Sequence, residues 1–503
     1  FDLGVILLLI RLLDYKGLHI RGSLLYALNP LTLFSIAGEA HFDSVMIFFL
    51  IFSLFAFEKK SYAWSWVGLG LAVQIKFIAV ILLPYYFFRG GMSRSWFFPL
   101  AILIPSLFFI DSLGGVLNGL IDFGSSSSFN GPVHRLIYDL IGSLELAGMI
   151  VSLAFLGITL WVLYAVRVVT RAAFIMFAAL VLLSPVVHFW YIYWIIPFIA
   201  VYPNLSWLVL SFCSSAYFMT MWSVEEGLGW ELPQWAFYLE WLPFLFVLAY
   251  ELRTVFSSRL KASEIWKSPE TLSVVIPTLN EGEKIAACID SVRAADFKVE
   301  SIIVCDGGST DDTVQQARER ACQVLNTKAG RGRQIRAGVD IVKSDLVLVL
   351  HADSLCPPEV PGRIIKAMKM NPEVSGGAVG QCFNAASFRL LLIEILNDAR
   401  ATLGGCSFGD QGQFFRLDAM RNSGGFPDYP LMEDVEQSLR MMERAPVIFL
   451  SERLIVSARQ WNADSFSRRI YAVINLVFRY RMSRILGRDI TSELHAIYYG
   501  KNK

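Results

Sequence analysis

The feature that most constrains this chain is the uneven distribution of its charged residues. Residues 1–250 hold 24 of the 87 Asp, Glu, Lys and Arg residues, and residues 251–503 hold the other 63. The hydrophobic content of 55% and the mean hydropathy of +0.51 are too high for an ordinary soluble protein. We therefore expect a polytopic α-helical membrane domain over residues 1–252, followed by a globular domain.

The membrane-like half contains a series of apolar segments separated by short polar connections. A spanning helix needs about 20 apolar residues. The segments lie at 1–12, 22–38, 43–57, 62–88, 95–110, 147–165, 172–202, 205–223 and 236–252. The two longest, 62–88 and 172–202, contain prolines and could each form two short helices. This pattern predicts about nine to eleven spans.

Positive charge in the connections predicts the orientation of these spans, because cytoplasmic connections are enriched in Lys and Arg. The basic connections are 11–21, 59–60, 89–94, 167–171 and 253–261. An alternating trace with eleven short spans places all of them, and the C-terminal half, on the cytoplasmic side. We expect a multi-pass protein of the cytoplasmic (inner) membrane. Phe1 lies inside a hydrophobic run without Met or a signal-peptide pattern, so we expect the native N-terminus to be missing.

Two stretches of the membrane half resemble polyprenol-phosphate-dependent membrane glycosyltransferases of the GT-C type. The matching residues are Asn29-Pro30, His41, Asp43, Phe129 and Asn130. The resemblance implies a catalytic or substrate role for His41, Asp43 and Asn130. The alternative for Asp43 is a helix-capping or interfacial role, because it directly precedes an apolar helix.

Residues 253–270 are polar and basic, as expected for a juxtamembrane linker. After them, strand-like runs alternate with amphipathic helical segments, which predicts a parallel α/β sheet over 271–463. Polar clusters follow three of the strands: Asn280-Glu281, Asp306 to Ser309, and Asp353. The carboxyl ends of parallel strands meet at one edge of the sheet, where ligands bind in open α/β folds. We therefore expect one site there.

The residue types at this edge fit a nucleotide diphosphate. Asp306 suits hydrogen bonding to a base or ribose, and Gly307-Gly308 permits a tight turn. Arg331 and Arg333 can pair with phosphate oxygens, although a solvated basic loop is the alternative. Asp353 can hold a divalent cation, Mg²⁺ or Mn²⁺, that bridges the diphosphate.

Residues 272–461 resemble family-2-type inverting glycosyltransferases of GT-A (Rossmann-like) fold. The motifs, in the family's order, are VVIPTLNE, VCDGGSTDDT, AGRGRQIRAG, LHADS, FGDQGQFFR, GGFPDYPLMEDVE and ARQW. The combination is most similar to a bacterial subfamily linked to arsenosugar biosynthesis and radical-SAM gene neighbourhoods. The usual DxD motif is replaced here by His351-Ala352-Asp353.

The resemblance implies a role for each matching residue. The donor-nucleotide contacts would be Pro277, Asn280, Glu281, Asp306, Gly307, Arg331 and Arg333. Asp353 would bind the metal, with His351 as a second ligand or a hydrogen-bonding partner. The acceptor side and the closing of the donor site would involve Asp410, Gln411, Glu433, Arg459 and Trp461. An N-cap role for Asn280 or Glu281, a turn role for Asp306 and a core role for Trp461 are the alternatives.

Asp434 is the candidate general base. An inverting transfer needs one carboxylate to take the proton of the acceptor hydroxyl. Glu433 and Asp434 stand at the start of a predicted helix, where the helix dipole favours a carboxylate anion. An ordinary acidic first turn is the alternative.

The remaining features bear on partners and on competing functions. The net charge of +1 gives no nucleic-acid footprint, and seven cysteines without a CxxC pair fit a reducing compartment. The tail, 464–503, is basic and amphipathic, so it could lie on a membrane or pack on the protein. The leading hypothesis is a membrane-bound glycosyltransferase acting on a nucleotide-diphosphate sugar and a polyprenyl-phosphate, other lipid or small-molecule acceptor. The alternatives are a bifunctional enzyme, whose cytoplasmic domain makes a polyprenyl-phosphate sugar for the membrane half, and a transporter with a regulatory nucleotide-sugar-binding domain.

Overall fold

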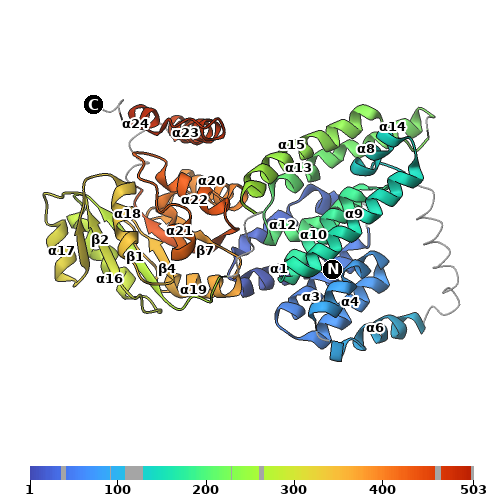
Figure 1. Ribbon diagram of the computed structural model, residues 1–503, viewed down its shortest axis with the longest axis horizontal. Coiled ribbons are helices and arrows are strands. Elements are labelled where there is room, and N and C mark those ends of the chain that lie inside the picture. Colours follow the sequence, from blue (N-terminus) through green and yellow to red (C-terminus); the bar gives the residue numbers. More distant parts are fainter. Residues whose placement is uncertain are drawn as a thin grey trace. The chain divides into compact units, whose positions relative to one another are not determined.

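The computed structural model describes residues 1–34, 41–90, 92–107, 128–227, 229–259, 266–458 and 466–499. The chain forms two compact units (Figure 1). Unit 1 comprises Phe1–Tyr15 and Ile20–Glu251, and unit 2 comprises Lys16–His19 and Leu252–Lys503.

The described elements of unit 1 are helices, apart from isolated β-bridges that join Phe129 and Asn130 to Val186. Its α-helices are α1 Asp2–Lys16, α2 Leu24–Ala27, α3 Asp43–Glu58, α4 Tyr62–Ile75, α5 Leu83–Arg89, α6 Phe97–Ser106, α8 Pro132–Ile141, α9 Leu144–Ala165, α10 Val169–Leu183, α11 Phe189–Ile192, α12 Ile196–Val201, α13 Leu205–Cys213, α14 Met219–Glu225 and α15 Gln234–Arg259. Short 3-10 segments connect several of them, including η3 Phe77–Leu82 and η7 Ser214–Phe218.

Three helical segments of the described chain are long and apolar enough to cross a membrane, fewer than the nine to eleven expected. They are Leu144–Ala165, Leu205–Glu225 and Gln234–Leu252. Other apolar segments form shorter helices; α1 and α3 are uninterrupted but have only 15 and 16 residues, and two longer segments are divided by breaks in the backbone. Segment 62–88 divides at Lys76, ahead of η3, and α10 ends at Leu183, just before Pro185. Helices of this length fall short of the ~20 residues that a perpendicular span requires.

Unit 2 contains a seven-stranded sheet with the order β3-β2-β1-β4-β6-β5-β7 (Figure 1). The strands are β1 Leu272–Thr278, β2 Ile302–Asp306, β3 Gln323–Asn326, β4 Leu346–Val349, β5 Gly376–Phe383, β6 Gln413–Arg416 and β7 Val447–Val456. β6 pairs antiparallel with both β4 and β5, whereas every other pair is parallel. This confirms the expected α/β fold of the C-terminal part, with one reversed strand that the sequence pattern did not predict.

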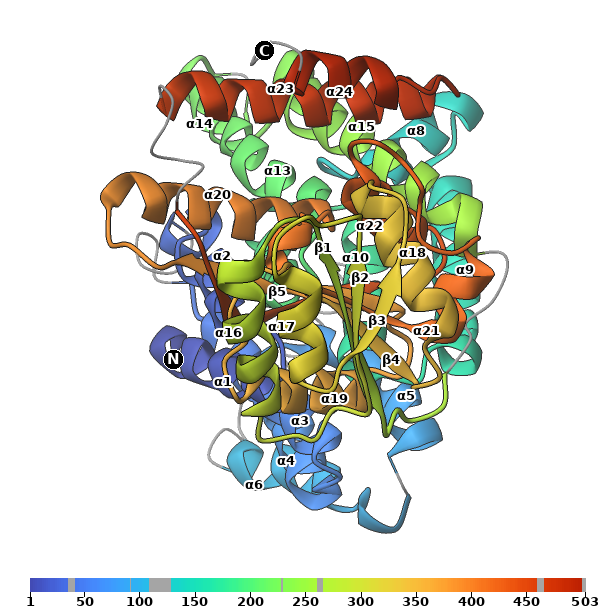
Figure 2. The ribbon, with the colours of Figure 1, turned by 90° about the vertical axis from the view of Figure 1, so that its left-hand side faces the viewer.

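Two layers of helices cover the sheet, because β1, β2 and β4 are apolar on both faces. One core packs α16 Gly282–Arg293, α17 Thr313–Glu319 and α19 Val360–Met370 against the sheet. The other core packs α18 Arg331–Ile341, α21 Leu417–Asn422 and α22 Glu433–Met442. Figure 2 shows α16 and α17 on one side of the strands and α18 on the other.

Three further helices complete unit 2. α20 Phe388–Gly404 follows β5, and its buried side packs beside β5 and β7. α23 Phe466–Ile485 and α24 Thr491–Tyr499 follow β7. Leu476, Tyr480 and Leu494 of these last helices share a core with Val435 of α22. The expected tail is therefore folded, and one face of it packs on the protein.

Candidate active site

The loops after β1 and β2 are joined by hydrogen bonds into one structure. Asn280 adopts a left-handed backbone (φ 55°), which Asn tolerates better than most residues. Its N–H donates to Ser309 Oγ (2.8 Å), and its side-chain Oδ1 accepts from the N–H of Thr310 (2.9 Å). The Glu281 N–H donates to Thr313 Oγ1 (2.9 Å). Asn280 and Glu281 thus stand at the expected strand end, and their contact with a nucleotide stays a prediction.

Asp306, at the end of β2, holds the turn that follows it. Its Oδ2 accepts from the N–H groups of Gly308 (2.9 Å) and Ser309 (3.0 Å), and its Oδ1 accepts from Ser309 Oγ. The residue is only 3% exposed. The turn role is therefore observed, and a carboxylate so fixed could still accept one more hydrogen bond from a base or ribose.

A glutamine that the sequence analysis did not single out joins the two strand ends. Gln334 of α18 is buried, and its Nε2 donates to Thr278 O (2.7 Å) and Cys305 O (2.8 Å). Pro277 is buried in β1 opposite Cys305, and the Gly307 N–H donates to Thr278 O (2.9 Å). Gln334 therefore links the carboxyl ends of β1 and β2 and fixes the distance between them.

The two arginines predicted to bind phosphate differ in their surroundings. Arg331, the first residue of α18, donates to the buried Glu433 carboxylate through Nε, and its Nη2 lies 4.0 Å from Asp434 Oδ2. Arg333 pairs with Asp428 at 3.1 Å, and both side chains are nearly half exposed. Gly332 allows the chain at Pro427 to approach α18 closely, because a Cβ on Gly332 would lie 2.4 Å from Pro427 O. Of these two arginines, only Arg331 faces the acidic residues at the start of α22.

The stretch His351-Ala352-Asp353 lies just after the end of β4. Burial lowers the pKa of His351 to about 3, with the Arg331 charge adding to the effect, so the imidazole is neutral. Its Nε2 is buried and has no hydrogen-bond partner among the described residues. Burial also raises the pKa of Asp353. An unpartnered imidazole nitrogen and a carboxylate two residues apart are a suitable pair of donors for a divalent cation.

Asp434 lies next to His351, and Gly409 separates them. A Cβ on Gly409 would lie 2.5 Å from His351 Nε2 and 3.6 Å from Asp434 Oδ2, so only glycine fits. The Gly409 N–H donates to Asp434 Oδ2 (2.8 Å), and the Val435 N–H donates to Oδ1 (2.7 Å). The carboxylate is thus fixed in its orientation by two backbone donors.

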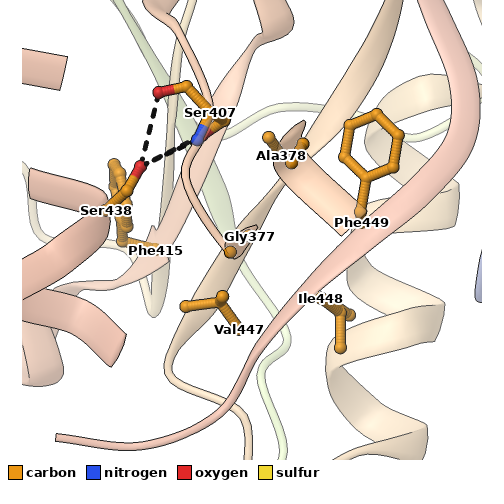
Figure 3. Close-up of a pocket in the computed structure, with 10 residues that line it drawn as sticks. Gly377, Ala378, Ser407, Phe415, Ser438, Val447, Ile448 and Phe449 are labelled. Atoms are coloured by element: carbon orange, nitrogen blue, oxygen red, sulfur yellow. Dashed lines mark hydrogen bonds between the residues drawn. The ribbon is translucent and has the colours of Figure 1, made fainter. Parts of the chain in front are cut away.

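A polar cluster behind Asp434 supports the first turn of α22. Ser438 Oγ accepts from the Ser407 N–H (3.2 Å) and lies 3.2 Å from Ser407 Oγ, beside a small cavity of about 10 Å³ (Figure 3). Gln413 Nε2 donates to Asp434 O (2.9 Å) and to Ser438 Oγ (3.0 Å). The cavity is too small for more than about one water molecule, so it is a packing feature and holds no substrate.

Asp410 also faces this group of charges. Burial raises its pKa to about 6, with Arg400 opposing and Asp434 adding to the shift. With its amide nitrogen toward Asp410, the Gln381 side chain donates to both Asp410 oxygens at 2.9 Å and accepts from Asn397 Nδ2 at 3.0 Å. Gln411 is fully buried and accepts from Arg400 Nη2 (2.6 Å). Gln411 therefore holds the loop, whereas Asp410 faces the site.

The sequence thus predicted most of the residues that meet at this edge of the sheet. The structure brings together Arg331, His351, Asp353, Asp410, Glu433 and Asp434. Arg459 and Trp461 lie outside the described residues. Gln334, Gln381 and Gln413 are the positioning residues that the sequence analysis missed, because a buried amide has no local sequence signal.

In unit 1, the three predicted residues lie around one segment, 187–194. Asp43 Oδ1 accepts from Lys76 Nζ (2.7 Å) and Trp194 Nε1 (2.6 Å). His41 stacks on Trp190, with ring centroids 4.6 Å apart. Asn130 Nδ2 donates to Val187 O (3.2 Å) and Glu240 Oε2 (3.1 Å). Asp43 is thus a buried ion-pair partner. Its N-cap role is not observed, because Phe42 occupies the N-cap position.

Two family models match separate parts of the chain. Residues 273–417 match the model described as "Glycosyl transferase family 2", and residues 4–89 match "Alpha-(1->6)-mannopyranosyltransferase, N-terminal domain". Unit 2 therefore carries a glycosyltransferase family 2 domain, as its motifs predicted.

Individual relatives match over part of unit 2. The undecaprenyl-phosphate 4-deoxy-4-formamido-L-arabinose transferase of Edwardsiella ictaluri is 30% identical over 162 residues, 30% of this chain and 50% of that protein. The glucosyl-3-phosphoglycerate synthase of Mycobacterium tuberculosis is 34% identical over 104 residues, 19% of this chain and 32% of that protein. The chain spans about half the length of the arabinose transferases that it matches.

Solved structures of glycosyltransferases are also similar in part. The mannosyltransferase PcManGT from Pyrobaculum calidifontis, in complex with GDP-Man and Mn²⁺, has a TM-score of 0.33 and 18% identity. That match covers 50% of this chain and 76% of that one.

Proposed function

We propose that the protein is a membrane-bound glycosyltransferase whose unit 2 transfers a sugar from a nucleotide-diphosphate donor with inversion. The observation that carries this proposal is the position of Asp434. Its carboxylate is fixed by two backbone N–H groups and lies beside His351 and Arg331, at the sheet edge where the donor would bind. The family 2 match over residues 273–417 supports the reaction class.

In the proposed reaction, Asp434 takes the proton of the attacking acceptor oxygen, which is the P–OH group of a singly protonated lipid phosphate or the hydroxyl of a small-molecule acceptor. The acceptor oxygen then forms a bond to the anomeric carbon as the bond from that carbon to the diphosphate breaks, and the electron pair leaves with the diphosphate. Arg331 offsets the charge that develops on the diphosphate oxygens. Asp410 can accept a hydrogen bond from the acceptor, because it faces the same group of charges.

A divalent cation, Mg²⁺ or Mn²⁺, fits the residues at the end of β4. His351 offers an unpartnered buried nitrogen, and Asp353 offers a half-buried carboxylate. No group of three or more His, Cys, Asp or Glu side chains in the described chain is arranged to hold a metal. Two protein donors are therefore available, and diphosphate oxygens and water would complete the coordination. When bound, the cation would neutralise the diphosphate charge.

The acceptor is proposed to be a lipid phosphate. The names of the arabinose transferase relatives include undecaprenyl phosphate, and three helical segments of this chain are apolar enough to span a bilayer. The basic connections favour unit 2 on the cytoplasmic side of the membrane. The narrower resemblance to an arsenosugar-linked subfamily would instead imply a small-molecule acceptor, and product analysis separates the two.

A second candidate function is a separate sugar-transfer site in unit 1. The match of residues 4–89 to the mannopyranosyltransferase model supports it, as does the position of His41, Asp43 and Asn130 around segment 187–194. Under this proposal, Asp43→Asn would abolish the use of a lipid-linked sugar and leave nucleotide release by unit 2 unchanged. Equal activity of the variant would leave Asp43 with only its structural contacts to Lys76 and Trp194.

The function is tested with the full-length protein in lipid nanodiscs. A panel of nucleotide sugars would be supplied with Mn²⁺ or Mg²⁺ and a bacterial lipid extract, and release of nucleotide diphosphate and labelling of lipid would be followed. Release from one donor, lost in Asp353→Ala, supports the transferase. Donor binding without release from any donor, with lipid and small-molecule acceptors both present, would favour the regulatory-domain alternative.

A further inference from the structure

Helix α20 carries an apolar stripe that no described part of unit 2 covers. Phe388 is 80% exposed, and Leu391, Ile395 and Leu396 are 42–48% exposed. Their spacing of three, four and one residues places them on one side of the helix. The opposite side contains Leu390, Ile393 and Ala401, which are buried. An apolar stripe of this size on a surface helix marks a contact with a partner.

Helix α23 likewise has an exposed apolar side and a buried side. Tyr471, Ile474, Phe478, Met482 and Ile485 follow each other at intervals of three or four residues, and each is 38–69% exposed. Leu476, Tyr480 and Ser483 on the other side are buried. Residues 466–499 contain six arginines and two acidic residues, so the helix pair α23–α24 is basic as well as apolar. This combination is typical of helices that lie in the interface of an anionic bilayer.

The inner sides of both helices contact residues that lie next to the active site in the sequence or support it. In α20, Asn397 contacts Gln381, which holds Asp410, and Arg400 holds Gln411. In α23, Tyr480 donates to Glu436 of α22 (2.6 Å), two residues after Asp434. Arg484 adds a second contact to Glu436 (2.7 Å). Each exposed stripe is therefore one helix thickness away from a proposed catalytic or acceptor-side residue.

A groove of about 600 Å³ lies beside the α20 stripe. It is lined by residues 382–388, Leu391, Glu394 and Ile455. Ile455 pairs with Leu355 through two backbone hydrogen bonds (2.9 and 3.0 Å), and Leu355 is two residues after Asp353. One wall of the groove is thus joined by backbone hydrogen bonds to the loop that carries the proposed metal ligand.

We propose that the outer faces of α20 and α23 dock on the surface of an anionic bilayer, so that a lipid-linked acceptor enters the site along this groove. A bilayer is the fitting occupant because the same chain carries three candidate membrane spans, joined to unit 2 through α15. The basic charge of α23–α24 complements anionic lipid headgroups. Docking does not depend on the proposed function, whereas the entry of the acceptor along the groove rests on it.

Docking is tested on the full-length protein in liposomes that contain phosphatidylglycerol. An environment-sensitive fluorescent amino acid would replace Phe478, Leu391 or, as a control, Arg318, which is exposed on α17. Nitroxide-labelled lipids should quench the probe at 478 and 391 and leave the probe at 318 unquenched. A probe that stays in water at 478 and 391 would overturn the proposal. A blue-shifted but unquenched probe would also overturn it, because protein would then cover the stripes.

Acceptor entry is tested with charge substitutions in the same protein. Phe388→Glu and Phe478→Glu should lower transfer to a lipid-phosphate acceptor at least tenfold, with the dissociation constant of the nucleotide diphosphate unchanged. Ile341→Glu, at a partly exposed apolar position on α18, is the matched control and should keep full transfer. Full transfer by both phenylalanine variants would refute entry from the membrane. In that case, quenching of the probe at 478 would still show that the protein docks on the bilayer. Nucleotide release by the control variant would show that the transferase itself is active.

Discussion

The guanidinium of Arg331, at the start of α18, is paired with the buried carboxylate of Glu433, and its Nη2 lies 4.0 Å from Asp434 Oδ2. The Arg331 guanidinium, which is expected to bind the donor diphosphate, is therefore held by Glu433, the residue next to the candidate base Asp434. A diphosphate would compete with Glu433 and Asp434 for Arg331. Donor binding would then draw the positive charge of Arg331 away from Asp434.

Arg331 and Arg333 should differ in their effect on donor binding. We expect Arg331→Gln to weaken nucleotide diphosphate binding about tenfold or more, since a charge-assisted hydrogen bond is worth about 1.5–3 kcal/mol. Arg333→Gln should weaken it less than about threefold, because its exposed pair is screened by solvent. Calorimetric titration measures both constants. Arg331→Lys keeps the charge near Glu433 and controls for misfolding. Equal losses for the two glutamine variants would contradict the assignment.

His351 should set the metal preference of the site. A His–Asp donor pair favours Mn²⁺ over Mg²⁺ more than a pair of carboxylates does. We expect His351→Asp to shift the preference of transfer toward Mg²⁺, and Asp353→Ala to raise the concentration of either metal needed for half-maximal activity at least about tenfold. Metal titrations of the transfer rate measure this. An unchanged Mn²⁺ to Mg²⁺ ratio in His351→Asp would exclude His351 as a ligand.

Gly409 should be intolerant of any side chain. A Cβ there would overlap His351 Nε2, so Gly409→Ala must displace either the imidazole or Asp434. Misplacement of a catalytic group by about 1 Å costs about a hundredfold in rate. We expect a loss of this size in kcat with donor binding retained. Gly404→Ala is the control, because its Cβ would meet only Arg481, at 3.7 Å or more. A fully active Gly409→Ala would mean that the two groups are not held together in catalysis.

Asp410 should make stability depend on pH. Because folding raises its pKa from the ordinary 3.8 to about 6, the folded state binds the proton more tightly than the unfolded state. The stability from this group is therefore complete below pH 4 and is lost as the pH rises through 6. The Asp410→Asn variant does not undergo this loss of folding stability, which is about 2 kcal/mol after allowance for solvent. The melting temperature of the variant, relative to wild type, should rise between pH 4 and pH 7. A constant difference would contradict the shift.

The residues that the sequence predicted are those with a local pattern. Asn280, Asp306 and Asp353 each follow an apolar run, so their place at one sheet edge follows from strand periodicity. The Glu433-Asp434 pair follows a loop rich in glycine and proline. Contacts between distant segments could not be predicted in this way. Arg331 and Glu433 are 102 residues apart, and Asn130 and Glu240 are 110 apart.

The membrane half shows the same limit. Hydropathy located the apolar segments, and the prolines explained why 172–202 divides. Segment 62–88 divides at Lys76, whose Nζ forms an ion pair with Asp43, 33 residues earlier, a contact that hydropathy does not register. The tail that contains α23 was visible as an amphipathic pattern, whereas the exposed stripe of α20 was not predicted. Which face of α23 packs on α22 depends on Tyr480 and Arg484 reaching Glu436, and only the fold determines it.

The most direct test of the account concerns Asp434. The full-length Asp434→Asn variant would be compared with wild type and with Asp340→Asn, a control at an exposed position of α18, using the donor that wild type accepts. General base catalysis contributes about 10²–10⁴ in rate, so we predict a loss of that size in sugar transfer. Nucleotide diphosphate binding should stay within about twofold of wild type. Transfer by Asp434→Asn at the wild-type rate would contradict the central claim.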